Sequence, residues 1–82
     1  MNEQEVIKKV LAEYPDRSVE EVYENKGLYL VIAPHKGMFM DESDPFFLVN
    51  SETGGMTPFI PSESFELYRT MMDPKKRFYS KR

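Results

Sequence analysis

The sequence predicts an α+β fold: an N-terminal helix, an antiparallel meander of three to four strands, and a C-terminal helix. Two amphipathic helical patterns lie near the ends of the chain, and short apolar runs separated by turn residues lie between them. With 82 residues, 40% hydrophobic and 30% charged, the chain has a globular composition and length enough for one core. We expect a single α+β domain over residues 1–74 and a basic C-terminal tail over residues 75–82.

The first element is a helix over about residues 3–14. Asn2 and Glu5 are spaced as a capping box, in which each side chain accepts a hydrogen bond from the other residue's backbone N–H. The apolar residues that follow form one helical stripe: Val6, Ile7, Val10, Leu11 and Tyr14. Pro15 disfavours a helical conformation at the residue before it and ends the helix.

Residues 18–27 fit two patterns. Ser18 and Glu21 are spaced as a second capping box, with apolar residues at helical spacing before Gly27. The same stretch also alternates with a period of two, and Asn-Lys-Gly at residues 25–27 is then a hairpin turn. We prefer a strand, because the apolar strand that follows needs a partner.

Residues 28–33 are apolar on both faces, as expected of a central strand that helices cover on one side. The second face, which carries Tyr29, Val31 and Ala33, must be covered within the chain or by a partner. A homodimer is therefore one alternative.

The remaining strands follow a polar loop over residues 34–45. Residues 46–50 and 56–60 have strand composition, and Ser-Glu-Thr-Gly-Gly at residues 51–55 supplies the turn. Because Pro58 cannot donate a ladder hydrogen bond, the last strand is expected at a sheet edge.

The second helix is expected to begin at Ser62, which is a suitable N-cap. Its buried stripe is predicted from Phe65, Tyr68 and Met71 or Met72. Asp73-Pro74 ends it.

Composition and charge exclude several classes of protein. No cysteine is present, so disulfides and thiolate sites are excluded, and a reducing compartment is favoured. The N-terminus is acidic and lacks the order of a secretion signal, and no apolar run approaches the ~20 residues that span a bilayer. We expect a cytoplasmic protein without a membrane partner.

No catalytic, cofactor or metal residues are predicted. His35 is the only histidine and lacks a companion for a transition-metal site. A calcium loop that began at Asp41 would need glycine at its sixth position, where Phe46 stands. Gly54-Gly55 is not followed by the Lys-Ser/Thr of a phosphate loop and is interpreted as a turn.

The loop before the second half of the sheet is the first candidate for partner binding. It combines flexible apolar side chains, which are favoured at protein contacts, with acidic ones: Met38, Phe39, Met40, Asp41, Glu42 and Asp44. An equally weighted alternative is that this segment folds back over the core. An acidic surface favours a basic protein partner.

The C-terminal residues are a second candidate, for anion binding. Residues 75–82 hold five basic residues and no acid: Lys75, Lys76, Arg77, Lys81 and Arg82. The other six bases stand against all 14 acids, so the rest of the chain carries a net charge of −8. A tail that binds nucleic acid competes with the simpler interpretation of a solvated chain end, which we favour.

One segment resembles a known family. Residues 44–54 (Asp-Pro-Phe-Phe-Leu-Val-Asn-Ser-Glu-Thr-Gly), with Phe-Ile-Pro at 59–61 and the helix that follows, are similar to the hairpin and helix of small YrhB-like immunity domains. The chain lacks that family's Gly-Trp pair in the central strand. The resemblance implies an α+β module that neutralises a partner by binding.

We therefore expect a small, non-catalytic protein-interaction module, either toxin-neutralising or an accessory protein of a mobile element. The alternative is a phage- or nucleic-acid-associated accessory protein that uses its basic C-terminal tail.

Overall fold

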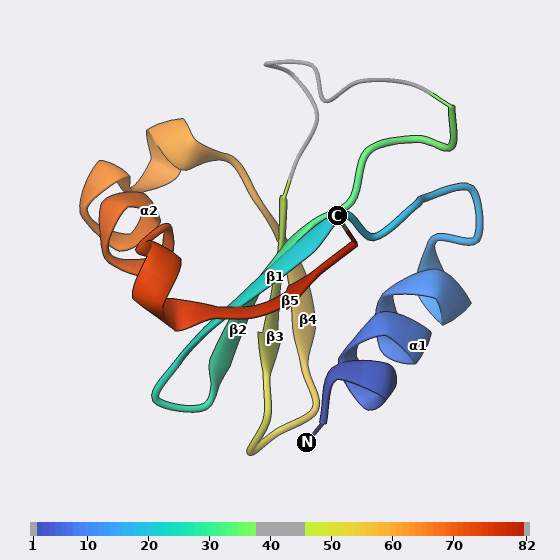
Figure 1. Cartoon of the computed structure of the whole chain (residues 1–82), viewed down its shortest axis with the longest axis horizontal. Coiled ribbons are helices and arrows are strands. Elements are labelled where there is room, and N and C mark those ends of the chain that lie inside the picture. The colour runs from blue at the N-terminus through green and yellow to red at the C-terminus, as the bar shows by residue number, and fades with distance from the viewer. Residues whose placement is uncertain (1, 38–45, 82) are drawn as a thin grey trace.

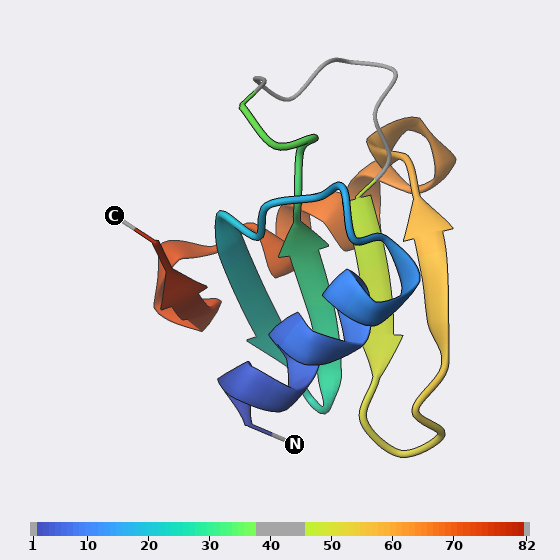
Figure 2. The ribbon, with the colours of Figure 1, turned by 90° about the vertical axis from the view of Figure 1, so that its right-hand side faces the viewer.

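A computed structural model describes residues 2–37 and 46–81, and in this part of the chain two helices cover opposite faces of a five-stranded sheet (Figures 1 and 2). The strands are β1 (Glu21–Asn25), β2 (Leu28–Ile32), β3 (Phe46–Asn50), β4 (Met56–Phe59) and β5 (Arg77–Ser80). The helices are α1 (Glu3–Glu13) and α2 (Phe65–Met71), with short 3-10 turns η1 (Pro61–Glu63) and η2 (Pro74–Lys76). The predicted α+β class is confirmed, and none of the described helices has the length and apolar character to cross a bilayer.

The sheet is antiparallel throughout and has the order β4-β3-β2-β1-β5. The first four strands form the predicted meander. The chain then leaves the edge strand β4, passes through α2 behind the sheet, and returns as β5 at the opposite edge (Figure 2). The N-terminal helix therefore packs on one face of the sheet, and the C-terminal strand forms one of its edges.

The capping box predicted for α1 is confirmed. The side chain of Asn2 accepts a hydrogen bond from the Glu5 N–H at 2.9 Å, and the Glu5 carboxylate accepts one from the Asn2 N–H at 3.4 Å. Val6 and Val10 of this helix are fully buried against the sheet. The helix is thereby fixed at its start and along its apolar stripe.

Residues 21–25 form a strand, as preferred, and join β2 through a two-residue turn. Asn25 pairs with Leu28, and the intervening Lys26 and Gly27 have φ angles of 52° and 82°. Such a turn matches the twist of paired strands, and glycine adopts positive φ without strain.

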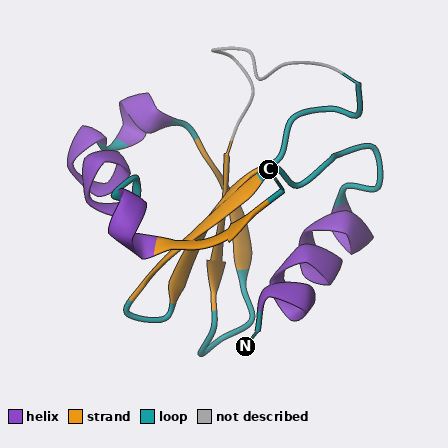
Figure 3. Ribbon diagram, in the orientation of Figure 1, coloured by secondary structure: helices purple, strands orange, loops and turns teal. Residues whose placement is uncertain are grey.

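The central strand β2 is covered on both faces by the chain itself. Tyr29, Val31 and Ala33 belong to the core on the α1 side of the sheet, whereas Leu30 belongs to the core on the α2 side. Figure 3 shows the two helices on opposite sides of the sheet. The face for which we considered a dimer partner is thus buried by α1.

The expectation of three to four strands is one strand short, because residues 77–80 form β5 beside β1. Phe78 and Tyr79 pack against the core beneath α1, and the rings of Phe78 and Tyr29 lie 5.2 Å apart. The two aromatic side chains hold this strand to the sheet, so residues 77–80 are part of the domain rather than of a separate tail.

The second helix begins later than predicted. Residues 61–63 form η1, and Ser64, not Ser62, caps α2 by accepting a hydrogen bond from the Leu67 N–H at 3.3 Å. The stripe that faces the sheet consists of Leu67, Tyr68, Met71 and Met72. Phe65 lies off this stripe and is 61% exposed, so its predicted burial is wrong.

The prediction that Pro58 lies at an edge is confirmed. The Asn50 N–H donates to the Gly55 carbonyl at 2.9 Å. In an antiparallel ladder, successive amides of a strand point alternately toward the partner strand and away from it, and this bond fixes which amides of β4 point toward β3. Under that alternation the amides of Thr57 and Phe59 turn toward β3. Position 58 faces outward, where an amide N–H would have had no partner strand.

Candidate functional site

Two large apolar side chains are exposed in the described part of the chain, and they lie close together in sequence. Ile60 follows β4 and is 37% exposed, and Phe65 begins α2. We call these two residues the 60/65 surface. Single exposed apolar side chains are common on protein surfaces, and the more exposed of these two, Phe65, is aromatic.

Hydrogen bonds hold the backbone of the 60/65 surface in place. The Glu63 carboxylate accepts from the Ile60 N–H at 3.1 Å, and the Arg69 Nε donates to the Phe65 carbonyl at 3.4 Å. The Ser64 cap fixes the start of α2 between them. Little backbone ordering is therefore required when a partner contacts these side chains.

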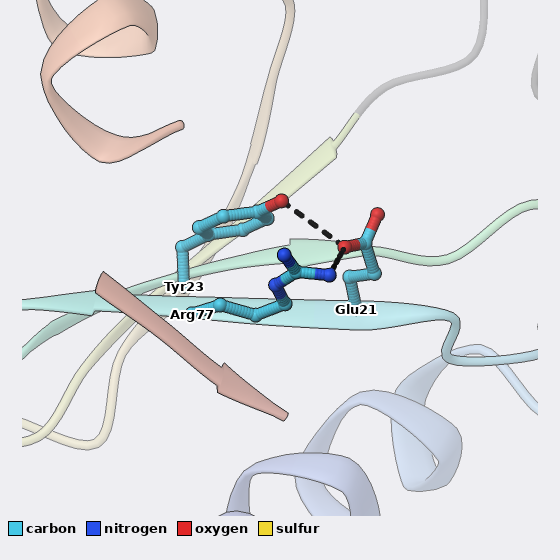
Figure 4. A network of polar contacts seen from close by, with 3 residues as sticks. All are labelled: Glu21, Tyr23 and Arg77. Carbon is cyan, nitrogen blue, oxygen red and sulfur yellow. Dashed lines mark hydrogen bonds and ion pairs between the residues drawn. The ribbon is translucent and has the colours of Figure 1, made fainter. Parts of the chain in front are cut away.

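A polar network lies on the α2 side of the sheet where β1 meets β5 (Figure 4). The Tyr23 hydroxyl donates to Glu21 Oε2 at 3.1 Å, and Arg77 Nη1 lies 3.4 Å from the same oxygen. Burial raises the pKa of the Tyr23 hydroxyl above its ordinary value, and the hydrogen bond to Glu21 and its negative charge raise it further. The network joins the last strand to the first.

The raised pKa of Tyr23 gives a testable pH dependence. Since the folded state holds the hydroxyl proton more tightly than the unfolded state, its contribution to stability is present below about pH 10 and lost as pH rises through the folded pKa. The pKa of Tyr29 is also raised, by burial first and then by Glu24 and Glu5, and acts in the same direction. We expect the free energy of unfolding, measured in urea, to fall steeply in alkaline solution.

Tyr23→Phe is the matched variant for this prediction. At neutral pH it should lower stability by about 1 kcal/mol, the net value of one hydrogen bond. In alkaline solution the difference from the parent chain should shrink, because the variant has no hydroxyl at this position to ionise. A constant difference across the whole range would contradict the assignment to Tyr23.

The basic residues at the C-terminus make contacts within the domain. Lys76 Nζ donates to the Thr70 carbonyl at 2.9 Å, and Lys81 Nζ donates to Ser18 Oγ at 3.1 Å and lies 3.9 Å from Glu20. With the Arg77–Glu21 pair, three of the cations named for anion binding have partners in their own chain. Lys75 is exposed, and residue 82 lies outside the described part. Anion binding by these residues stays a prediction.

His35 lies in the segment that follows β2. Its Nε2 is 3.2 Å from Asp16 Oδ2, and both side chains are more than one-third exposed. Within residues 2–37 and 46–81, no group of three or more histidines and acids is placed to hold a metal ion. The arrangement around His35 is a surface pair that links the end of α1 to the end of β2.

Arg17 is adjacent to this pair and is the one buried charged residue of the described chain, at 8% exposure. Its Nη1 donates to the Ala33 carbonyl at 3.0 Å, and its Cζ lies 5.4 Å from the centroid of the Phe47 ring. Its Nε is buried without a hydrogen-bond partner. A buried donor without an acceptor costs about 1–3 kcal/mol.

Of the residues predicted to bind a partner, Met38, Phe39, Met40, Asp41, Glu42 and Asp44 all lie outside the described residues. That prediction stays a prediction. A surface hollow of about 220 Å³ lies between α1 and the β3–β4 turn and is lined by Lys9, Glu13, Tyr14, Gly54 and Met56. It is smaller than the ~300–1,000 Å³ of typical small-molecule pockets.

The comparisons with known proteins give no family for this chain. Neither the protein-family models, nor the curated proteins, nor the solved structures yielded a match.

Sequence reasoning missed two of the features described above. The helical spacing of Phe65 with Tyr68 and Met72 predicts burial, and only the late start of α2 shows that Phe65 lies off the buried stripe. Arg17 stands between Asp16 and Ser18 in a polar stretch, where nothing in the pattern indicates burial. No sequence signal for either feature was available without the fold.

Proposed function

We propose that this chain is a small, non-catalytic protein-interaction module that binds a basic protein partner through the 60/65 surface. The observation that carries the proposal is the 61% exposure of Phe65 on a domain whose other aromatic side chains in the described part are at least partly buried. Aromatic side chains are enriched at protein interfaces, where they supply large contact areas at low conformational cost.

Charge around the 60/65 surface supports a basic partner. Glu63 and Glu66 are exposed next to Phe65, and Arg69 is the nearby base. The chain as a whole carries a net charge of −3. Because electrostatic complementarity speeds association and selects among partners, the affinity should weaken as ionic strength rises.

The biological role of such a module is open between two proposals. The resemblance to YrhB-like immunity domains implies toxin neutralisation, in which the module blocks a toxin by covering it. An accessory protein of a mobile element would use the same kind of surface.

The test is a binding measurement with single substitutions. The immobilised chain is used to isolate a partner, and the dissociation constant of the purified pair is then measured by calorimetry. Phe65→Ala is expected to weaken binding by about tenfold or more, the effect of removing a hot-spot aromatic side chain. Gln4→Ala, at an exposed position of α1, is the control and should bind like the parent chain.

Two further variants separate this surface from the acidic loop. Ile60→Ala should weaken binding in the same direction as Phe65→Ala. Replacing Asp41, Glu42 and Asp44 together by alanine tests the loop that the sequence favoured. Full affinity in the Ile60→Ala/Phe65→Ala double variant would refute the 60/65 surface, and loss of affinity only in the loop variant would move the site there.

A further inference from the structure

The hollow between α1 and the β3–β4 turn has room for a small ligand and is open to solvent. Its volume is about 220 Å³, below the ~300–1,000 Å³ of pockets that take drug-sized molecules. Tyr14 and Met56 pack against the core on the α1 side and line the hollow with their remaining surface. The size therefore suits a ligand of only a few non-hydrogen atoms.

The two charged residues of the hollow, Lys9 and Glu13, carry opposite charges and are not paired with each other. They lie one helical turn apart, a spacing at which side chains are near neighbours. Within residues 2–37 and 46–81, neither side chain makes a hydrogen bond or an ion pair. The ammonium of Lys9, which is partly buried, keeps its donors for a ligand, and the Glu13 carboxylate keeps its acceptors.

The other walls of the hollow are held in place by the fold. The Gly54 N–H donates to the Asn50 carbonyl at 2.8 Å, which closes the β3–β4 turn. On the opposite wall the Tyr14 ring lies 4.5 Å from the buried Phe47 ring. Little ordering is required when a ligand enters, and its charged groups find their partners on the two charged side chains of α1.

Glycine at position 54 keeps the hollow open beside the ammonium. A Cβ atom at this position would lie 3.7 Å from Lys9 Nζ. The φ angle of Gly54 is 72°, a conformation that other residues rarely adopt. Both the backbone and the missing side chain therefore preserve space next to Lys9.

We propose that this hollow binds a free α-amino acid with a small apolar side chain. The ligand carboxylate accepts a hydrogen bond from the Lys9 ammonium, the ligand ammonium donates one to the Glu13 carboxylate, and the ligand side chain lies against Tyr14 and Met56. A simple anion or a simple cation would match one of the two charges and be repelled by the other. The site is separate from the 60/65 surface and does not depend on it.

The test is an NMR titration of the ¹⁵N-labelled full chain with L-alanine at constant pH and ionic strength. We expect saturable shifts of the backbone amides of Gly54 and Met56, which line the hollow. Sodium acetate and methylamine hydrochloride each supply one of the two charges and should bind at least about tenfold more weakly. The absence of a saturable shift with L-alanine, or equal affinity for either single-charge probe, would overturn the proposal.

Substitutions of the two charged residues identify their part in binding. Lys9→Gln and Glu13→Gln should each weaken L-alanine binding by about tenfold or more, because each removes one charge-assisted hydrogen bond. Lys8→Gln is the matched control, at an exposed position of the same helix that does not line the hollow, and should bind like the parent chain. Unchanged affinity in either of the first two variants, or an equal loss in the control, would contradict the assignment.

Gly54→Ala tests the location of the ligand, because the added methyl group enters the hollow. Gly37→Ala is its matched control, since Gly37 has a φ angle of 75° and no atom of the described residues within 4 Å of an added Cβ. We expect Gly54→Ala to weaken L-alanine binding and Gly37→Ala to leave it unchanged. Parent-like affinity in Gly54→Ala would place the ligand elsewhere and refute the site. If Gly54→Ala does not fold, the charge variants decide the question.

Discussion

Deleting residues 77–82 is expected to unfold the domain or leave it barely stable. β5 forms one edge of the sheet, and its Phe78 and Tyr79 cover the core beneath α1. Burial of an aromatic side chain contributes about 1.5–3 kcal/mol, so the two partly buried rings together with the lost ladder should cost about 3–5 kcal/mol. Proteins of ordinary stability have only about 5–15 kcal/mol in total, and a chain of this size lies toward the lower end.

Circular dichroism and urea unfolding of the truncated chain check this expectation. The control is deletion of residues 81–82 alone, which leaves β5 intact and removes the contacts of Lys81: its ion pair and backbone hydrogen bond with Glu20 and its side-chain hydrogen bond to Ser18. Exposed ion pairs contribute about 0–1 kcal/mol, so this control should stay folded. A stable, cooperatively folding chain that ends at residue 76 would show that the last strand is dispensable.

The same deletion is a poor test of nucleic-acid binding by the C-terminus, because any loss of binding would accompany loss of the sheet. Substitution of Lys75 and Lys76 by glutamine removes charge without removing β5, and is the sharper experiment for that alternative.

Phe47→Ala is expected to destabilise the domain by about 3–5 kcal/mol, the range measured when a buried phenylalanine is truncated. Phe47 is fully buried in β3, its ring lies 4.5 Å from that of Tyr14, and it supports the guanidinium of Arg17. Truncation would open a cavity between α1 and the sheet and remove the platform beneath a buried charge.

Phe65→Ala is the matched control, because it is the same substitution at a position that is 61% exposed. Surface changes of this kind usually alter stability by less than about 0.5 kcal/mol. The two variants should therefore differ by several kcal/mol in urea unfolding. Similar values for both would mean that the packing of Phe47 described here is wrong.

Local signals predicted much of the fold. Residues spaced like Asn2 and Glu5 can each accept a hydrogen bond from the other's free backbone amide at a helix start, and both hydrogen bonds are present. The sequence at 25–27 fits a turn with positive φ, and Pro58 fits an edge where no donor is needed. The Asn2–Glu5 and Pro58 signals depend on neighbouring residues alone. The turn at 25–27 was preferred over a helix because the apolar strand that follows needs a partner.

The errors arise where tertiary contacts outweigh local composition. Four charged side chains are interspersed with Phe78 and Tyr79 between residues 76 and 82, and the charge density suggested a solvated tail. Only the core beneath α1 provides a place for the two rings. The start of α2 was likewise predicted at Ser62, whereas Ser64 caps the helix two residues later.

The candidate sites were the least predictable part. Exposure of Phe65 and burial of Arg17 both depend on where a side chain lies relative to the sheet, which no spacing rule encodes. The acidic loop that composition favoured lies outside the described residues, so its part in binding awaits the substitutions proposed above.

The outward-facing side of β4 bears on how copies of this protein behave when crowded together. Pro58 offers no amide on that side, and the next amide, that of Ile60, is already bonded to the Glu63 carboxylate. A strand from another molecule would find few donors with which to extend the sheet. Extension of the sheet by strand addition at this edge is thereby disfavoured.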